Sequence, residues 1–351
     1  MTTHSIDDAT LNAWATDPQS AVALHLRQEL LPVEGRGAVF FPPTFAGGDY
    51  NIDKLADGTS VALVDSVGSQ ANRMEPIFLE EQLRHLIPQI TIEYGDAKKE
   101  TDGSVSLLEA GHRLGDAVVR STELHAEAQA AFKAMLRSND AGPLAKLAPT
   151  SIVFGVWDSR DTGAKVPRIV QSVIRAWDVS KLQRSAQYTP TLDYAALEVF
   201  SDAEREKAEG KSSSPLAERG FVHVPAVGSH GGVVAKGPIV RDVTVNLIAL
   251  RRLGGPDADL VRKYVLGLAL LAAIAPQDPF LRQGCLLVPD AETPAEWTII
   301  SRDGTRSPAE LAPDVVLSYA TAAAEAFGVG EARTLQFDKK LAKADTKAKS
   351  K

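Results

Sequence analysis

The sequence predicts an α+β protein in which helices pack mainly on one face of an antiparallel sheet. Stretches typical of strands, either alternating or rich in β-branched residues, recur through most of the chain. Helical patterns lie between them, but without the strict alternation of a doubly wound parallel sheet. The 351 residues, 44% of them hydrophobic and 24% charged, are typical of a soluble globular protein with a sizeable core.

The first half of the chain is expected to begin with a helix. Apolar residues at helical spacing predict it over 11–31, although Pro18 interrupts the pattern early. The run SVALVDSV predicts a buried strand over 60–67. The further elements expected are a short strand and turn-rich loop over 35–51, a helical pattern from Met74 to Ile87, a strand over 89–95, a mostly helical stretch over 107–137 and a strand over 150–159.

The second half contains the clearest alternation, over 168–179, which favours a long strand with a helix as the competing interpretation. The polar, Ser-rich stretch 201–220 is expected to be an exposed insertion or a mobile linker. The remaining expectations are a hairpin or flexible loop over 221–238, helices over 242–253 and 258–275, short strands over 284–289 and 296–301, and a helix over 308–329.

Composition excludes several classes of protein. A formal net charge of −7 argues against a globally basic nucleic-acid binder, although a local basic surface remains compatible with it. The single cysteine, Cys285, allows no disulfide framework and fits a reducing cytoplasm. The N-terminus shows no secretory pattern, and the longest apolar run, 264–276, is too short to cross a bilayer, so no membrane partner is expected.

Motifs for catalysis or for cofactors are not found. None of the seven histidines forms an H-x-x-x-H pair, and neither G-x-S-x-G nor a nucleotide P-loop occurs, so no metal and no cofactor are expected. Asp65 could act as a general base at the end of its strand, but an acid there more often caps the next turn. The stretch GSHGGVVAKG could meet a phosphate through its amides or could be a mobile hairpin tip.

The stretch LVDSVGSQANRMEPIF, residues 63–78, gathers hydrogen-bond donors where a strand gives way to a helix. Such a helix start offers free N–H groups and a positive dipole end to an anion, and Arg73 could grip a phosphate. The alternative is capping, with Ser66 or Ser69 closing the helix and Arg73 pairing with a surface acid. From these residues alone capping is favoured, and Pro76 either opens a helix near Met74 or kinks an earlier one.

A basic run lies in this acidic chain between positions 165 and 184. It carries five basic residues and one acid, Asp178, for a net charge of +4, with Trp177 interleaved and Tyr188 close by. Basic and aromatic residues together on a strand can hold single-stranded nucleic acid. The alternative is a solvated edge strand with protective charges.

Four stretches together resemble a known family. DSVGSQANRMEP, SIVFGVWDSRDTGAKVPRIVQSVIRAWDV, GGVVAKGPIVRDVTVNLIALRRL and DPFLRQGCLLVP are similar to the CRISPR-associated RAMP backbone subunit of type I-G (formerly I-U) Cascade, in order over residues 35 to 290. The resemblance implies a modified RNA-recognition-motif, ferredoxin-like fold, βαββαβ in outline, with inserted thumb-like and finger-like elements. We therefore expect one domain over 1–338, with an inserted loop or hairpin over about 190–238, and a flexible Lys-rich tail over 339–351.

The function that the resemblance implies is a non-enzymatic scaffold for antiviral defence. Its expected partners are CRISPR guide RNA, further copies of the chain head to tail, other Cascade subunits and target DNA in the assembled complex. The alternative is a metal-dependent nuclease or other hydrolase built around Asp65 and His230. The candidate RNA-binding residues, from the helix start, the basic run and the glycine-rich loop, are Ser69, Gln70, Asn72, Arg73, Arg160, Lys165, Arg168, Arg175, Arg184, His230, Gly231, Gly232 and Lys236.

Overall fold

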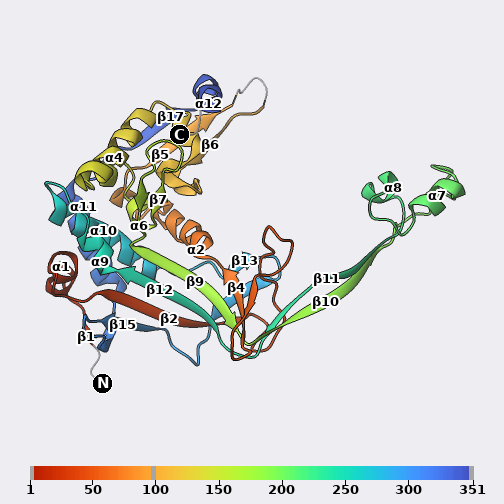
Figure 1. Cartoon of the computed structure of the whole chain (residues 1–351), viewed down its shortest axis with the longest axis horizontal. Helices are drawn as coiled ribbons and strands as arrows, with labels where there is room; N and C mark the ends of the chain where they lie inside the picture. Colours follow the sequence, from red (N-terminus) through yellow and green to blue (C-terminus); the bar gives the residue numbers. More distant parts are fainter. Residues whose placement is uncertain (1–3, 96–99, 348–351) are drawn as a thin grey trace.

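A large, mainly antiparallel sheet forms the centre of the protein (Figure 1). The structure is a computed structural model, in which residues 4–95 and 100–347 are described. Along the sheet the strand order is β1-β16-β15-β2-β12-β9-β4-β3, and β14 pairs with both β2 and β13. The strands are β1 (His4–Ser5), β2 (Ala23–Pro32), β3 (Ile52–Lys54), β4 (Ser60–Asp65), β9 (Val170–Trp177), β12 (Ile239–Asn246), β13 (Phe280–Arg282), β14 (Cys285–Pro289), β15 (Glu296–Ile300) and β16 (Arg306–Glu310).

Two of the central strands correct helices expected from the sequence. The helix predicted over 11–31 is a short helix, α1 (Asp8–Thr16), followed by strand β2. The helix predicted over 242–253 is the end of strand β12 followed by α9 (Leu247–Arg251), which Asn246 caps. Both strands carry a period-two apolar pattern. All of β12 pairs with residues 23–30 of β2, where each strand supplies the other's backbone hydrogen-bonding partners.

Helices cover one face of this sheet, so the α+β class predicted from the sequence is confirmed. Helix α10 (Ala258–Ile274) is apolar almost all round and lies buried between the sheet and α11 (Pro313–Phe327). The two helices approach closely at Gly267, where an added Cβ would lie 2.7 Å from the Cα of Ala320. Within the described residues no helix has the length and apolarity needed to span a membrane.

A second lobe lies beyond the helix-covered face and contains a three-stranded sheet (Figure 1). Strand β5 confirms the prediction over 89–95, and the stretch 107–137 is mostly helical, as predicted. The strand predicted over 150–159 is instead a short helix over 150–153 followed by a two-residue strand at 156–157. The elements of the lobe are β5 (Ile90–Tyr94), β6 (Gly103–Ser106), β7 (Val156–Trp157), β8 (Lys165–Val166), β17 (Arg333–Gln336), α3 (Ala117–Arg120), α4 (His125–Ser138), α5 (Gly142–Leu147), α6 (Thr150–Val153) and α12 (Lys339–Asp345).

The tail expected to be frayed contributes a helix to this lobe. Helix α12 lies beside α3, and Asp345 accepts a hydrogen bond from Arg120 at 3.0 Å. Residues 348–351 of the expected tail lie outside the described residues.

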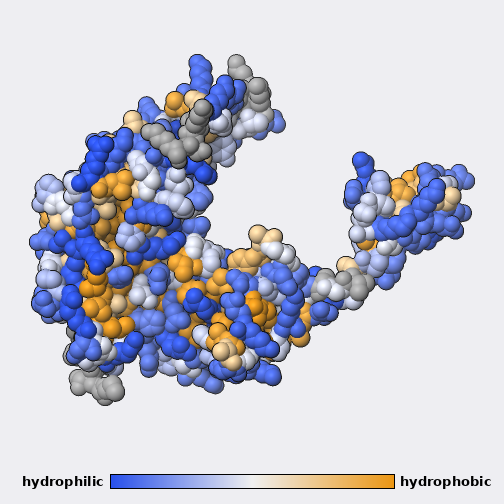
Figure 2. Space-filling view, viewed as in Figure 1, coloured by the Kyte–Doolittle hydropathy of each residue, from blue (hydrophilic) through white to orange (hydrophobic). Residues whose placement is uncertain are grey.

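A two-stranded arm projects from the opposite end of the sheet (Figure 1). It consists of β10 (Val179–Tyr188) and β11 (Val224–Ala235), paired antiparallel, so the glycine-rich stretch 221–238 is a strand of a hairpin. Ten strand residues span about 30 Å. The tip carries α7 (Asp202–Ala208) and α8 (Pro215–Glu218), where the Ser-rich stretch was expected to be an exposed insertion. Figure 2 shows a wide hollow between the arm and the second lobe, with hydrophobic residues on the tip.

The base of the arm is fixed to the body by the loop 33–51. Asp49 accepts hydrogen bonds from Lys181 of β10 and from His230 of β11, and Lys181 lowers the pKa of Asp49 to about 2. Phe40 exchanges backbone hydrogen bonds with Val233. The loop passes so close that a Cβ on Gly232 would lie 2.5 Å from a methyl of Val39, which is why glycine is required there.

Candidate nucleic-acid interface

Helix α2 (Val67–Met74) begins directly after strand β4, at the stretch rich in hydrogen-bond donors. Ser66 caps the helix: its Oγ accepts a hydrogen bond from the N–H of Ser69 at 3.2 Å. The N–H groups of Val67 and Gly68 precede the first possible intrahelical acceptor and remain at the positive end of the helix. Capping and an exposed helix start therefore coexist, because one serine satisfies only one of the free amides.

Asp65 holds the side chains of α2 in place. It is 4% exposed and accepts hydrogen bonds from Gln70 Nε2 at 2.6 Å and from Arg73 Nε at 3.1 Å. Arg73 also donates through Nη2 to the carbonyl of Leu281 at 2.6 Å, which ties α2 to β13. The acid that was expected to cap a turn or to act as a base is thus an internal partner of an arginine.

Gln70 points into the protein rather than outward. Its side chain is 1% exposed, and its Oε1 accepts a hydrogen bond from Ser172 of β9 at 2.6 Å. Because both ends of its amide have partners inside, the side chain of Gln70 does not reach an external phosphate. Arg73 differs, since 31% of its side chain is exposed.

A shallow depression of about 290 Å³ lies in front of the helix start. Two arginines, Arg73 and Arg282, and the exposed ring of Phe45 border it. In Figure 1 this part of the body, α2 and β13, faces the hollow below the second lobe. The full lining is Pro43, Phe45, Val64, Asp65, Ser66, Ser69, Arg73, Leu281 and Arg282. Two guanidinium groups beside the start of a helix suit a phosphate, and an aromatic ring suits a base stacked next to it.

A second group of candidate residues lies toward the lobe. Asn72 is exposed and accepts a hydrogen bond from Arg113 at 3.3 Å, and the exposed Arg168 lies against Gly155, next to the same arginine. Lys165 is placed 4.4 Å above the ring of Trp157, a cation–π contact on the surface. Arg160 is exposed in the turn between β7 and β8.

The basic run 165–184 does not form one continuous strip. Arg175 pairs in register with Leu63 and Val240, and its side chain lies on the face of β9 opposite to Ser172, which contacts α2. Arg168 precedes β9 instead of lying along it. The basic residues of this run are close together in the sequence, but they do not form one basic surface on the folded protein.

The remaining candidates belong to the arm. Arg184 and Lys236 are exposed on β10 and after β11, and the guanidinium of Arg184 lies 6.0 Å from the ring of Phe41. Gly231 and Gly232 pack against neighbouring backbone, at β10 and at the loop 33–51 respectively. His230 lies edge-on to Tyr50 with the ring centroids 4.9 Å apart, and its Nε2 is 3.0 Å from Asp49.

The two residues of the alternative hydrolase have separate surroundings. Asp65 bonds to Gln70 and Arg73 beside α2, whereas His230 bonds to Asp49 at the base of the arm. Within the described residues, no group of three His, Cys, Asp or Glu side chains could hold a metal ion.

Sequence reasoning missed Phe45 and Arg282, the other two main borders of the depression. Phe45 lies in a turn-rich loop, and Arg282 lies 209 positions beyond Arg73 in a stretch quoted only for family resemblance. Their proximity arises from tertiary contacts such as that between Arg73 and Leu281. No local pattern would have joined them.

Comparison with known proteins adds one match. The family profile described as CRISPR-associated protein GSU0053 matches residues 24–181, just under half of the chain. Over this part the chain is similar to CRISPR-associated proteins. A search of curated proteins found no match. The matched part runs from β2 to the start of β10, so it includes β4, α2, β9 and the second lobe up to β8.

Proposed function

We propose that this protein is a non-catalytic CRISPR-associated subunit that binds CRISPR guide RNA and repeats head to tail along it, in a cytoplasmic type I complex with other Cascade subunits and target DNA. The observation that carries the proposal is the depression at the start of α2. It combines two arginines, the start of helix α2 at Ser66 and Ser69, and an exposed aromatic ring on the surface of an acidic protein. Phosphate contacts of this kind position an RNA without reading its sequence.

The strand order supports the RNA-recognition-motif part of the proposal. Four strands taken in chain order, β2, β9, β12 and β15, lie in the sheet as β15-β2-β12-β9, each antiparallel to its neighbours. Helical segments connect β2 to β9 and β12 to β15, as in a split βαβ unit. In this scheme β3 and β4 are added at the edge beyond β9.

The arm supports repetition along the RNA. A long ribbon with its own small cluster of aromatic rings, Tyr194, Phe200 and Phe221, is ordered far from the core, although its surroundings in a single copy are solvent. An element of this kind can reach a neighbouring molecule. A contact between two different surfaces of identical chains generates an open row.

Filter binding to single-stranded RNA tests the proposal. Arg73→Ala and Arg282→Ala are each expected to weaken binding to two unrelated RNAs by similar factors, and the RNA should be recovered uncut. Glu80→Ala, an exposed change near the end of the same helical segment, is the control. Binding that both arginine variants leave unchanged, or specific cleavage of the RNA, would refute the proposed function.

A further inference from the structure

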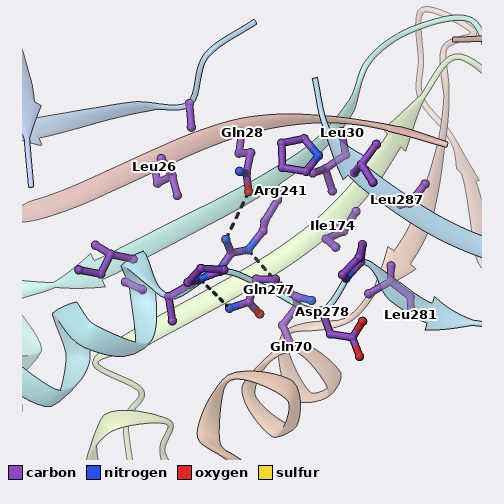
Figure 3. Close-up of a pocket in the computed structure, with 18 of the residues that line it drawn as sticks. Leu26, Gln28, Leu30, Gln70, Ile174, Arg241, Gln277, Asp278, Leu281 and Leu287 are labelled. Carbon is purple, nitrogen blue, oxygen red and sulfur yellow. Dashed lines mark hydrogen bonds between the residues drawn. The ribbon is translucent and has the colours of Figure 1, made fainter. Parts of the chain in front are cut away.

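A cavity of about 500 Å³ lies on the helix-covered face of the central sheet (Figure 3). Its floor is formed by β2, β9 and β12, and the segment 275–279 after α10 borders it. The walls are largely apolar, with Leu26, Leu30, Ile174, Leu281, Leu287 and Trp297 among them. The volume is in the range of cavities that hold small ligands or inserted side chains.

Arg241 lies on the floor of this cavity without a carboxylate. It is 3% exposed, and its hydrogen bonds go to the neutral oxygens of Ser172 at 3.2 Å, Gln70 at 3.4 Å and Gln28 at 3.3 Å. Its buried Nη2 has no hydrogen-bond partner. Burial lowers the pKa of Arg241 to about 10, which still leaves the guanidinium charged at neutral pH.

The acid among the lining residues does not neutralise this charge. Asp278 lines the cavity, but its Oδ1 accepts a hydrogen bond from the N–H of Phe280, and within the described residues it makes no ion pair with Arg241. A buried charge with a free donor is costly unless a partner group completes it. A ligand that fits this cavity would carry a carboxylate flanked by apolar side chains. The carboxylate would pair with the guanidinium, and the apolar side chains would pack against the walls.

One exposed segment of the same chain has this composition. Leu197 and Val199 are 58% and 56% exposed, and they flank the exposed Glu198 at the tip of the arm. Glu198 has a φ of 58°, in a turn closed by hydrogen bonds from Leu197, Glu198 and Val199 back to residues 193–195, which holds the three side chains outward.

Three other acids beside exposed apolar residues already have partners. Asp193 pairs with Arg205, Asp259 pairs with Arg262, and Glu80 accepts a hydrogen bond from Gln82. Within the described residues, Glu198 is the one acid placed between two exposed large apolar side chains.

We infer that Leu197–Val199 of one copy inserts into the Arg241 cavity of the next copy, with Glu198 bonding to the guanidinium. The arm extends away from the body of the protein, where β2, β9 and β12 line the cavity, so the contact joins two molecules (Figure 1). The inference rests on the proposed function, to which it adds the surfaces that meet between successive copies. Because tip and cavity are different surfaces, each copy offers both, and the contact propagates along a row.

Sedimentation velocity on the full chain tests this contact, with and without a single-stranded RNA long enough for several copies. Glu198→Lys removes the carboxylate with which the tip would bind a neighbouring cavity. Arg241→Met removes the guanidinium with which the cavity would bind a neighbouring tip. Each variant alone is expected to lose association between copies by at least about tenfold, as expected for removal of one partner of a buried charge pair. Leu197→Ser with Val199→Ser, at exposed positions, tests the tip without changing its charge.

An equimolar mixture gives the sharpest result. The Arg241→Met protein keeps its tip and the Glu198→Lys protein keeps its cavity, so the two are expected to form pairs that cannot extend further. Glu206→Lys makes the same charge change on the exposed side of α7, between Arg205 and Lys207, and should associate like the unchanged protein.

Three results would overturn the inference: an unchanged protein that stays monomeric with and without RNA, a Glu198→Lys protein that still forms rows, or an Arg241→Met protein that folds and still forms rows. The last result would mean that, in the unchanged protein, water rather than a neighbouring copy hydrogen-bonds to the guanidinium of Arg241. RNA binding by these same variants, measured by filter binding, separates the outcomes. Variants that bind RNA as tightly as the unchanged protein but show no altered association would refute this contact and leave the proposed function standing.

Discussion

Arg113 and Glu75 form a buried ion pair, with Nε of the arginine 2.7 Å from Oε2 of the glutamate. Glu75 directly follows α2, while Arg113 comes from the second lobe and also donates to Asn72 of α2 and to the carbonyl of Gly155. The guanidinium lies 5.3 Å from the ring centroid of Phe154. The pair therefore joins the end of α2 to the second lobe, and it fixes the helix whose start borders the candidate RNA site.

Removing one member of this pair is expected to destabilise the protein strongly. Arg113→Met leaves an unpaired buried carboxyl and should lower the free energy of unfolding by about 3–5 kcal/mol. Urea denaturation measures the change. The double variant Arg113→Met with Glu75→Leu removes both charges. It should recover most of the lost free energy of unfolding, because two buried apolar side chains leave no charge without a partner. A loss in the double variant as large as in the single one would contradict this account.

The same pair predicts a dependence of stability on pH. Burial raises the pKa of Glu75 to about 7, against the opposing effect of Arg113. The folded state then binds a proton more readily than the unfolded state, so the contribution of Glu75 to the free energy of unfolding falls as pH rises from about 4.5 to about 7. Urea denaturation at pH 5 and pH 8 should show that the unchanged protein loses more stability across this range than Glu75→Gln does. Equal pH dependence in both would contradict the raised pKa.

Asp65→Asn should weaken structure rather than abolish a reaction. The asparagine can still accept from Gln70, but it loses the charge that holds Arg73, so stability should fall by about 1–2 kcal/mol. Asp53→Asn, exposed on β3, is the control. We expect any nuclease activity of the purified protein to be the same in all three proteins. Metal-dependent cleavage lost only in Asp65→Asn would revive the alternative function.

The salt dependence of RNA binding should distinguish the two faces of the sheet. Arg73→Ala and Arg282→Ala should each reduce the slope of log K against log salt by about 0.7, the value for one phosphate contact on a single strand. Arg175 was expected from the sequence to contact phosphate in the same way. It lies on the face of β9 that points away from α2, so Arg175→Ala should change the slope less. Equal slope changes for Arg73→Ala and Arg175→Ala would mean that the RNA contacts both faces.

Gly232→Ala should loosen the base of the arm. Gly232 has a φ of 92° and an added Cβ would meet the carbonyl oxygen of Phe40 at 2.9 Å, so strain and overlap act together. Gly228→Ala, with a φ of 69° and open space around it, isolates the strain. Thermal unfolding should show a clear drop for Gly232→Ala and about 1 kcal/mol or less for Gly228→Ala. Equal losses would mean that the loop moves aside.

The sequence by itself determined the α+β class and the elements with one clear period. Strand β9 was predicted from alternation, α10 from an apolar helical pattern and α2 from a helix start after a strand that ends in Asp65. These elements depend on local spacing, because a strand alternates its faces and a helix repeats every 3.6 residues. The similarity to CRISPR-associated proteins was also recognised from sequence motifs.

Tertiary structure decided which side chains meet and which do not. It turned 23–32 and 239–246 into strands, since each needed the other as a hydrogen-bonding partner. It placed Gln70 inside beside Ser172, brought Arg282 to Arg73, and put Arg175 on the opposite face. The same folding left Arg241 buried without a carboxylate. None of these relationships has a spacing in the chain that predicts it, because they arise from contacts between segments far apart in the sequence.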